Sequence, residues 1–300
     1  MLLNAVTYRA TERTLRAAYM KALQELPTEH LAFFEDIPVT TDTITYKMIV
    51  RKSKVTEWIG DRTKQNLEAF ILTRRLRLWD DSVAVDMGDI LFDRLGQVAA
   101  AMADLADDYV EHQFDALCSL LADGHGSEAA YLGYDETSFF SAAHPIDTGI
   151  VSGGTQQNYW SDLDLSATNI VTVRAAMRAY KGENGHSMRV HPDTLWITPD
   201  LEGTAENIID KNPLAGGEGN VLYKKFKIVV LDIDGATTLW GLADLSKRMK
   251  PFGFPHTKQT VPRWLVKPGE EHAEGLFGFD FYATDMPLWW RLLSKCVHTA

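Results

Sequence analysis

The chain has 300 residues, of which 45% are hydrophobic and 24% charged, so it can form a sizeable globular core. Its formal net charge of -11 argues against a protein that grips nucleic acid over its whole surface, because such proteins are usually basic. That charge is compatible with a protein that encloses DNA without binding it tightly. The two cysteines, Cys118 and Cys296, are isolated, which fits a reducing, cytosolic site of assembly.

Residues 4–26 are predicted to form an amphipathic helix that Pro27 ends. An isolated helix of this length has little to bury against, so we expect an arm that docks on something else. We expect no signal peptide at the N-terminus. We also expect no contact with a membrane, since no apolar run reaches the roughly 18 residues that a bilayer requires.

Two extended segments, 43–55 and 69–85, flank a polar turn and predict a long hairpin. This part is locally basic within an acidic protein. It carries, besides Lys47, the cations Arg51, Lys52, Lys54, Arg62, Lys64, Arg74, Arg75 and Arg77. Trp58 lies in the polar turn and is best explained as an anchor for a partner, because tryptophan and arginine are enriched at interfaces.

Residues 87–123 carry apolar side chains at alternating steps of three and four, without an internal proline. Asp86 or Asp89 can favour the helix start, and Gly124 can end it. The pattern predicts one continuous helix about 55 Å long, since each residue adds about 1.5 Å. A two-faced helix of this length is typical of a spine against which sheets and neighbours pack.

Beyond residue 126 the pattern becomes α/β. The predicted elements are helices over 167–181 and 199–209, and strands over 194–197, 227–231, 237–241 and 276–283. Ser166 is a candidate cap for the first helix, and Asp234-Gly235 predicts a hairpin between the second and third strands. Phe277, Phe279 and Phe281 are expected on one strand face.

Candidate chemistry is weak throughout the chain. His186 and His191 are five residues apart in an extended stretch and would point to opposite faces, so we expect no metal site, no cofactor and no catalytic residue. Two alternatives stay open. One is a metal-dependent hydrolase that uses His186, His191 and Asp193. The other is a DNA-binding module that uses the basic hairpin, whose affinity would fall steeply with salt.

Trp289 and Trp290 lie beside predicted strands, and core packing is one interpretation of both.

Three segments resemble the Mu-like major head subunit family in their residues, order and spacing. Glu57-Trp58, Gly60 and Arg62 resemble that family's Glu-Trp-x-Gly-x-Arg segment. Phe139-Phe140 with His144-Pro145 is similar to its Phe-Phe and His-Pro segment, and residues 195–202 are similar to its strand-into-helix stretch. The order of arm, basic hairpin, long helix and α/β part is also the family's.

The resemblance implies an α+β chain with the Hong Kong 97-type capsid fold. Its implied parts are an N-terminal arm (1–42), an extended hairpin loop (43–85), the spine helix of a peripheral domain (86–125), a mainly axial domain (126–270) and a C-terminal return to the peripheral domain (271–300). Residues 250–274 have no recognisable counterpart, which leaves the end of the axial domain open.

The resemblance also implies a function, which is structural and not enzymatic. The expected role is the major capsid protein of a tailed phage or prophage, which self-assembles into hexamers and pentamers of an icosahedral shell around double-stranded DNA. Expected partners are a separate scaffold, a portal, decoration proteins and DNA held without sequence-specific binding. We expect assembly in the bacterial host cytoplasm and a final place in the virion.

The residues expected at the subunit interface belong to the basic hairpin. They are Arg51, Lys54, Glu57, Trp58, Arg62, Arg74 and Arg75.

Overall fold

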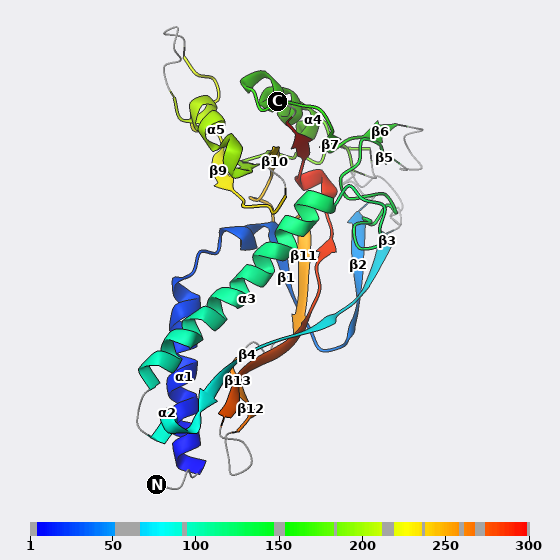
Figure 1. Ribbon diagram of the computed structural model, residues 1–300. Coiled ribbons are helices and arrows are strands. Elements are labelled where there is room, and N and C mark those ends of the chain that lie inside the picture. The colour runs from blue at the N-terminus through cyan, green and yellow to red at the C-terminus, as the bar shows by residue number, and fades with distance from the viewer. Residues whose placement is uncertain are drawn as a thin grey trace, which may run out of the picture.

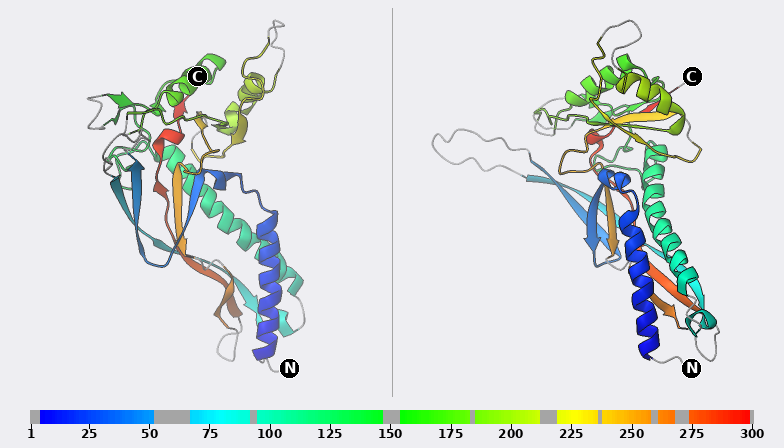
Figure 2. Two further views of the ribbon diagram at one scale, coloured as in Figure 1. Left: turned by 180° about the vertical axis from the view of Figure 1, so that it is seen from behind. Right: turned by 90° about the vertical axis from the view of Figure 1, so that its left-hand side faces the viewer.

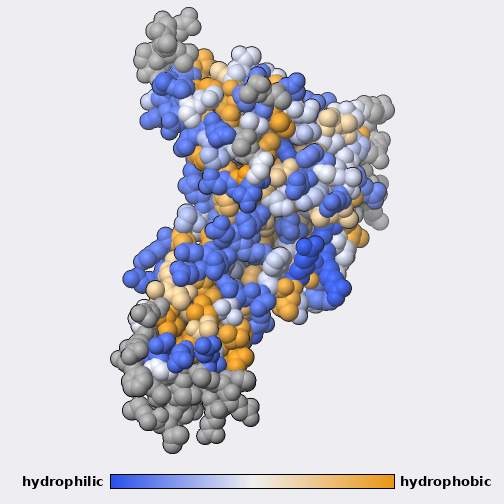
Figure 3. Space-filling view, in the orientation of Figure 1, coloured by the Kyte–Doolittle hydropathy of each residue, from blue (hydrophilic) through white to orange (hydrophobic). Residues whose placement is uncertain are grey.

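The computed structural model describes residues 5–51, 67–91, 95–146, 154–182, 185–211, 219–235, 238–257, 261–267 and 274–298. Figure 1 shows an elongated molecule with two regions that meet near the C-terminal end of helix α3 (Leu95–Asp123). We call the part with α3 and a six-stranded sheet the spine region. The part with a five-stranded sheet is the cap region. In the space-filling view of Figure 3, the left-hand outline is hollowed where the two regions meet.

The N-terminal helix α1 (Ala5–Glu25) forms as predicted and lies beside α3 in the spine region (Figure 2). Leu15 and Tyr19 are fully buried, and the Tyr19 ring lies 5.8 Å from that of Phe279. The expectation of an arm that docks elsewhere is therefore wrong for this helix. Its apolar stripe is buried against α3 and the sheet of its own chain, which supplies the stabilisation that an isolated helix lacks.

The six-stranded sheet of the spine region is built around one long strand. Its members are β1 (Phe34–Val39), β4 (Arg77–Asp86), β11 (Phe252–Thr257), β12 (Arg263–Val266), β13 (Glu274–Ala283) and β14 (Met286–Pro287). Phe277, Phe279 and Phe281 are at most 4% exposed, and the Tyr109 ring of α3 lies 5.7 Å from Phe279 and 5.4 Å from Phe281. The prediction that the three phenylalanines share a face is confirmed.

The hairpin is shorter than predicted. Strand β2 (Thr43–Arg51) pairs antiparallel with β3 (Leu67–Arg75) in nine residue pairs. The extended segment after Leu76 then leaves the hairpin as β4, which pairs with β13 along its whole length, from Asp86 opposite Glu274 to Arg77 opposite Ala283. Both segments have the period of a strand, and only the distant partner decides which of them stay together.

The expected 55 Å helix is replaced by two helices, α2 (Met87–Leu91) and α3, with residues 92–94 outside the described part. The 29 residues of α3 correspond to about 43 Å. Gly88 and Gly96 lower the helix propensity of this stretch. The carboxylate of Asp86 accepts a hydrogen bond from the Gly88 backbone N–H, so Asp86 favours a helix start as predicted.

The five-stranded sheet of the cap region has the order β7 (Tyr159–Trp160), β15 (Lys295–Val297), β10 (Leu239–Ala243), β8 (Thr194–Ile197) and β9 (Lys227–Val230). The predicted hairpin across Asp234-Gly235 is wrong, because β8 lies between β9 and β10 and pairs with both. All four residues of β8 are buried, as expected for a central strand.

Two helices lie in the cap region, α4 (Ala167–Arg178) and α5 (Glu202–Ile209). The Ser166 hydroxyl accepts from the Asn169 backbone N–H at 3.2 Å, so the predicted cap is confirmed. Pro199 opens a short 3-10 turn (Pro199–Leu201) before α5, at a tolerated first-turn position.

Each of the two sheets takes strands from segments far apart in the chain. Strands β11 and β12 belong to the spine sheet although they lie within 126–270, and β15 belongs to the cap sheet although it lies within 271–300. The chain therefore crosses between the regions again after β13. The resemblance to the family concerns the order of the elements along the chain. That order does not determine which distant strands pair with one another.

A substitution at Gly241 of β10 would show how tightly the cap sheet is packed. A methyl group there would meet the Ser294 carbonyl oxygen and the Trp196 indole, so Gly241→Ala should lower the free energy of unfolding by about 3 kcal/mol. Gly203→Ala in α5, where the added methyl meets nothing, should raise it by about 0.5 to 1 kcal/mol. Urea denaturation measures both, and equal midpoints for the two variants would contradict this packing.

Candidate assembly surface

The β2–β3 hairpin has one buried face, which holds it on its own subunit. Ile44, Met48 and Leu72 are at most 9% exposed, because alternate side chains of a strand point to the same face. Tyr46 lies on this face, and its hydroxyl is 3.1 Å from both carboxylate oxygens of Glu35 in β1. The hairpin is thus fastened to the spine sheet at its base.

Arg74 also lies on the fastened side. Its Nη2 donates to the carbonyl oxygens of Leu132 at 3.1 Å and Ala130 at 3.4 Å. Burial lowers the pKa of this guanidinium, and the nearby Asp285 carboxylate opposes the shift. The hydrogen bonds described for Arg74 lie within its own chain, and its expected contact with a neighbour stays a prediction.

The opposite face of the hairpin is open. Ile71 is 61% exposed, and Lys47, its cross-strand partner, is exposed as well. Arg75 lies on the same face and is exposed. We call Lys47, Ile71 and Arg75 the outer face of the hairpin. It combines an apolar side chain with a lysine and with an arginine, and arginine is enriched at protein interfaces.

The other residues of the expected interface lie at the end of β2 or beyond it. Arg51 ends β2, and its backbone is paired with Leu67. Lys54, Glu57, Trp58 and Arg62 lie outside the described residues. Their contacts with a neighbour stay a prediction.

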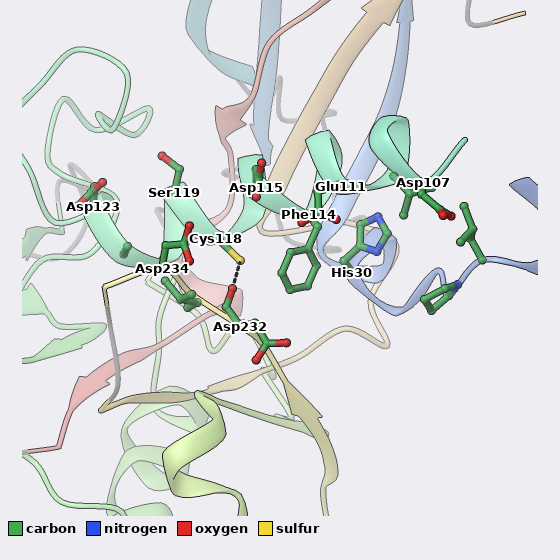
Figure 4. Close-up of a pocket in the computed structure, with 15 residues that line it drawn as sticks. His30, Asp107, Glu111, Phe114, Asp115, Cys118, Ser119, Asp123, Asp232 and Asp234 are labelled. Atoms are coloured by element: carbon green, nitrogen blue, oxygen red, sulfur yellow. Dashed lines mark hydrogen bonds between the residues drawn. The ribbon is translucent and has the colours of Figure 1, made fainter. Parts of the chain in front are cut away.

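A cavity of about 790 Å³ lies between α3, the segment after α1, and the segment between β9 and β10. Asp107, Glu111 and Asp115 of α3 line it at successive turns of the helix, and Asp232 and Asp234 face them (Figure 4). All five carboxylates are exposed, and α3 contains no lysine or arginine. We call this cavity the acidic groove. Sequence reasoning missed it, although the spacing of the α3 acids was visible.

The groove also has apolar and neutral walls. Leu26, Phe114 and Ile233 line it. Burial, followed by the charge of Asp115, raises the pKa of the Cys118 thiol to about 12, so this thiol is no nucleophile at neutral pH. Its Sγ lies 3.6 Å from the Asp232 carbonyl oxygen, to which it donates.

His30 lies in the groove wall and is only 5% exposed. Burial lowers the pKa of its imidazole, and a hydrogen bond to Gln113 opposes that shift. The ring is therefore neutral near pH 7, with one nitrogen that can accept a hydrogen bond. Within the described part of the chain, Nε2 has no hydrogen-bond partner.

A buried amide joins the two regions behind this surface. Asn158 is fully buried, and its Nδ2 donates to the carbonyl oxygens of Phe139, Leu293 and Trp290 at 2.8, 3.2 and 3.3 Å. Its Oδ1 accepts from the Ser141 backbone N–H at 2.9 Å, which fixes the orientation of the amide. Every polar atom of this side chain therefore has a hydrogen-bond partner, at the place where the chain passes between the two regions.

His144 extends this polar contact. Its Nε2 donates to Asn158 Oδ1 at 3.0 Å, and its Nδ1 lies 2.7 Å from Asp135 Oδ2. The ring stacks on Trp290 with centroids 3.7 Å apart and planes 5° apart. Trp290 is fully buried and Trp289 is 9% exposed, so core packing is the correct interpretation of both tryptophans.

Lys295 connects the cap sheet to the end of the spine helix. It is 2% exposed, and its ammonium group donates to the carbonyl oxygen of Ala122 in the last turn of α3. A cation there also interacts favourably with the helix dipole. Burial nevertheless lowers the pKa of Lys295 to about 8, and Asp123 only partly opposes that shift.

The histidines considered as metal ligands do not converge. His186 and His191 are both exposed. Asp193 instead accepts hydrogen bonds from the Thr194 hydroxyl at 2.9 Å and the Leu245 N–H at 3.1 Å. No group of three or more candidate ligands is found in the parts of the chain that the structure describes. Among those same parts, no helix has the length and apolarity to cross a membrane.

Comparison with known sequences identifies one family. The family model described as Mu-like prophage major head subunit gpT matches residues 9–162 and 151–233. The major capsid protein of Escherichia phage Mu is 22% identical over 158 residues, which are 53% of this chain and 50% of that protein. The Mu-like prophage FluMu major head subunit of Haemophilus influenzae is 23% identical over 157 residues, 52% of this chain and 49% of that protein. The chain thus spans about half the length of these curated relatives.

Comparison with solved structures concerns the fold. A chain of the procapsid of bacteriophage JBD30 superposes with a TM-score of 0.60 and 19% identity, over 99% of this chain and 77% of that chain. This likeness confirms the expected α+β, Hong Kong 97-type capsid fold.

The buried amide should contribute strongly to stability. Asn158→Ala removes the acceptor of the Ser141 N–H and of the His144 ring, and a donor to three carbonyl groups, so the free energy of unfolding should fall by about 2 to 5 kcal/mol. Asn169→Ala, which removes one exposed hydrogen bond to the Asp164 carbonyl, is the matched control and should cost under about 1 kcal/mol. Thermal unfolding of both variants measures the two losses of stability. Similar losses would contradict a special role of Asn158 in holding the two regions together.

Lys295 should give a specific pH dependence. Below pH 8 both the folded and the unfolded chain carry its proton, while between about pH 8 and 10.5 only the unfolded chain keeps it. The free energy of unfolding of the wild type, relative to Lys295→Met, should therefore rise across this window by on the order of 2 to 3 kcal/mol. Urea titrations at pH 7.5, 9 and 10 measure the difference, with the exposed Lys181→Met as control. A flat difference would contradict the buried ammonium.

Proposed function

Because the chain belongs to the Mu-like prophage major head subunit gpT family, we propose that it is the major capsid subunit of a tailed phage or prophage. It assembles into hexamers and pentamers of an icosahedral shell that encloses double-stranded DNA. The observation that carries this proposal is the superposition on a chain of the JBD30 procapsid over 99% of the residues. The role is structural, and no catalytic residue, metal or cofactor is part of it.

The two regions have natural roles in such a shell. The spine region, with α1, α3 and the sheet around β13, serves as the peripheral domain. The cap region, with α4, α5 and the sheet around β10, serves as the axial domain at the centres of hexamers and pentamers. The boundaries follow the sheets, so residues 252–257 and 263–266 are peripheral and 295–297 axial.

The hairpin is the extended loop that lies across a neighbouring subunit. Its base is fastened to its own subunit through Tyr46 and Arg74, which leaves the outer face free for a neighbour. Arg51, Lys54, Glu57, Trp58 and Arg62, together with Arg75, are the proposed contact residues. An exposed hairpin with an apolar side chain on its open face gains stability from a partner that covers it.

The remaining partners follow from the role as a shell subunit. A scaffold, a portal and decoration proteins are separate chains. DNA is enclosed without sequence-specific binding, which agrees with the acidic stripe along α3. Assembly takes place in the cytoplasm of the bacterial host, and the finished shell is part of the virion.

Electron microscopy of the purified chain tests the function directly. Wild type should form shells, sheets or capsomers, and Trp58→Ala should stay soluble but assemble at least about tenfold less, because an aromatic anchor can contribute 2 kcal/mol or more. Trp58→Phe, which keeps an aromatic ring, is the control and should assemble more fully than Trp58→Ala.

Two results would count against this function. A wild type that stays a monomer with stoichiometric metal would favour the hydrolase alternative. A monomer whose DNA affinity falls steeply with salt would favour the DNA-binding alternative. Normal shells from Trp58→Ala would remove that residue from the interface without affecting the function.

A further inference from the structure

The acidic groove gathers negative charge without a cation from its own chain. The carboxylates that line it are those of Asp107, Glu111, Asp115, Asp123, Asp232 and Asp234. All of them are exposed, and within the described residues none of them makes an ion pair. Two cations near the groove are engaged elsewhere, because Lys227 is held by Glu29 at 2.8 Å and Lys295 donates to the Ala122 carbonyl oxygen.

The Cys118 thiol shows that the charges of both walls act on one place. Burial is the main cause of its raised pKa, and the charges of Asp115, Asp232, Asp234 and Glu111 follow. Two of these acids come from α3 and two from the segment between β9 and β10, which faces α3 (Figure 4). Like charges held around one place repel one another, and a cation in the groove relieves that repulsion.

His30 gives a second, independent indication of a ligand. It is only 5% exposed and lines the groove beside Phe114, with the two ring centroids 6.1 Å apart (Figure 4). A buried ring nitrogen normally has a hydrogen-bond partner, and Nε2 of this ring has none in the described part of the chain. Because burial lowers the pKa of the ring and keeps it neutral near pH 7, Nε2 can accept a hydrogen bond from a protonated amine.

The acids of α3 form a row with a regular spacing. Asp107, Glu111 and Asp115 follow one another at steps of four residues, so each step advances about 6 Å along the helix. Carboxylates spread in this way do not enclose a single metal ion, and no group of three or more candidate metal ligands is found in the described residues. Phe114 and Ile233 add apolar surface to the walls. The groove therefore suits a ligand whose positive charges are distributed along an apolar chain.

We propose that the acidic groove binds a linear aliphatic polyamine. An extended run of four methylene groups separates two amines by roughly 6 Å, given single bonds of about 1.5 Å, which matches the step between the acids of α3. The ammonium groups pair with Glu111, Asp115 and the opposing Asp232, the methylene groups cover Phe114, and an ammonium group donates to Nε2 of His30. This inference does not depend on the proposed function, because it concerns the single subunit.

Isothermal titration calorimetry of the purified full-length chain with spermidine, a linear triamine, tests the proposal. Spermidine should bind saturably at one site per chain, with a Kd below about 1 mM. The affinity should fall as salt is raised above about 0.1 M, because ion pairs near the surface are then screened. Hexaamminecobalt(III) has the same charge in a compact form and should bind at least about fivefold more weakly, since it cannot follow the row of acids.

Removal of charge at nearly constant size locates the site. Glu111→Gln with Asp115→Asn should weaken spermidine binding at least about tenfold, because two of the charges around Cys118 are lost. Asp232→Asn with Asp234→Asn removes charge from the opposite wall and should also weaken it. All four residues are exposed, so folding should be preserved, which circular dichroism and the unfolding midpoint verify.

The matched control neutralises two exposed acids at the same helical spacing outside the groove. It is Glu202→Gln with Glu206→Gln in α5, and it should bind spermidine within about twofold of the wild type.

Several outcomes would overturn the polyamine site. One is the absence of saturable spermidine binding, and another is an unchanged affinity in both groove variants. Equal binding of hexaamminecobalt(III) and spermidine, or an equal loss in the α5 control, would show a general attraction of cations to an acidic chain. None of these results bears on the formation of shells, which electron microscopy tests separately.

Discussion

The whole arrangement depends on how a chain that crosses repeatedly between two sheets is held at the crossing. The Asn158 side chain does this, since one buried amide contacts the loop at Phe139, the turn at Trp290 and the segment that leads into β15. A hydrophobic contact is non-directional and would allow these segments to slide. An amide with every donor and acceptor satisfied fixes their register, because a shift of any segment leaves a buried polar group without a partner.

The position of the spine helix relative to the cap sheet follows from the same crossing. Lys295 comes two residues after Leu293, which Asn158 contacts, and its ammonium reaches back to the last turn of α3. The Asn158 contact thus helps to position the Lys295 ammonium group at the C-terminal end of α3. Burying this cation is costly, as its lowered pKa indicates, so the hydrogen bond to Ala122 and the helix dipole only partly offset the loss of hydration.

Local patterns predicted the elements well and their partners poorly. The period of α1, the Ser166 cap of α4 and the alternation in β13 depend on neighbours in sequence, and all three are confirmed. Whether 77–86 stays in the hairpin or joins β13 is decided by residues about 200 positions away. The same holds for β9 and β10, which a turn signal joined but β8 separates. A pattern of period two specifies a strand and one buried face, and it carries no information on which strand lies beside it.

The acidic groove, likewise, could be predicted from the sequence only in part. The acids of α3 at 107, 111 and 115 are one turn apart and could be read as a stripe from the sequence, while the opposing Asp232 and Asp234 come from a different region and could not. Their meeting creates a groove instead of a solvated face. Exposed ion pairs contribute only about 0 to 1 kcal/mol each. A ligand with several cations makes several such pairs at once, so pairs that are weak singly can add up to a measurable affinity.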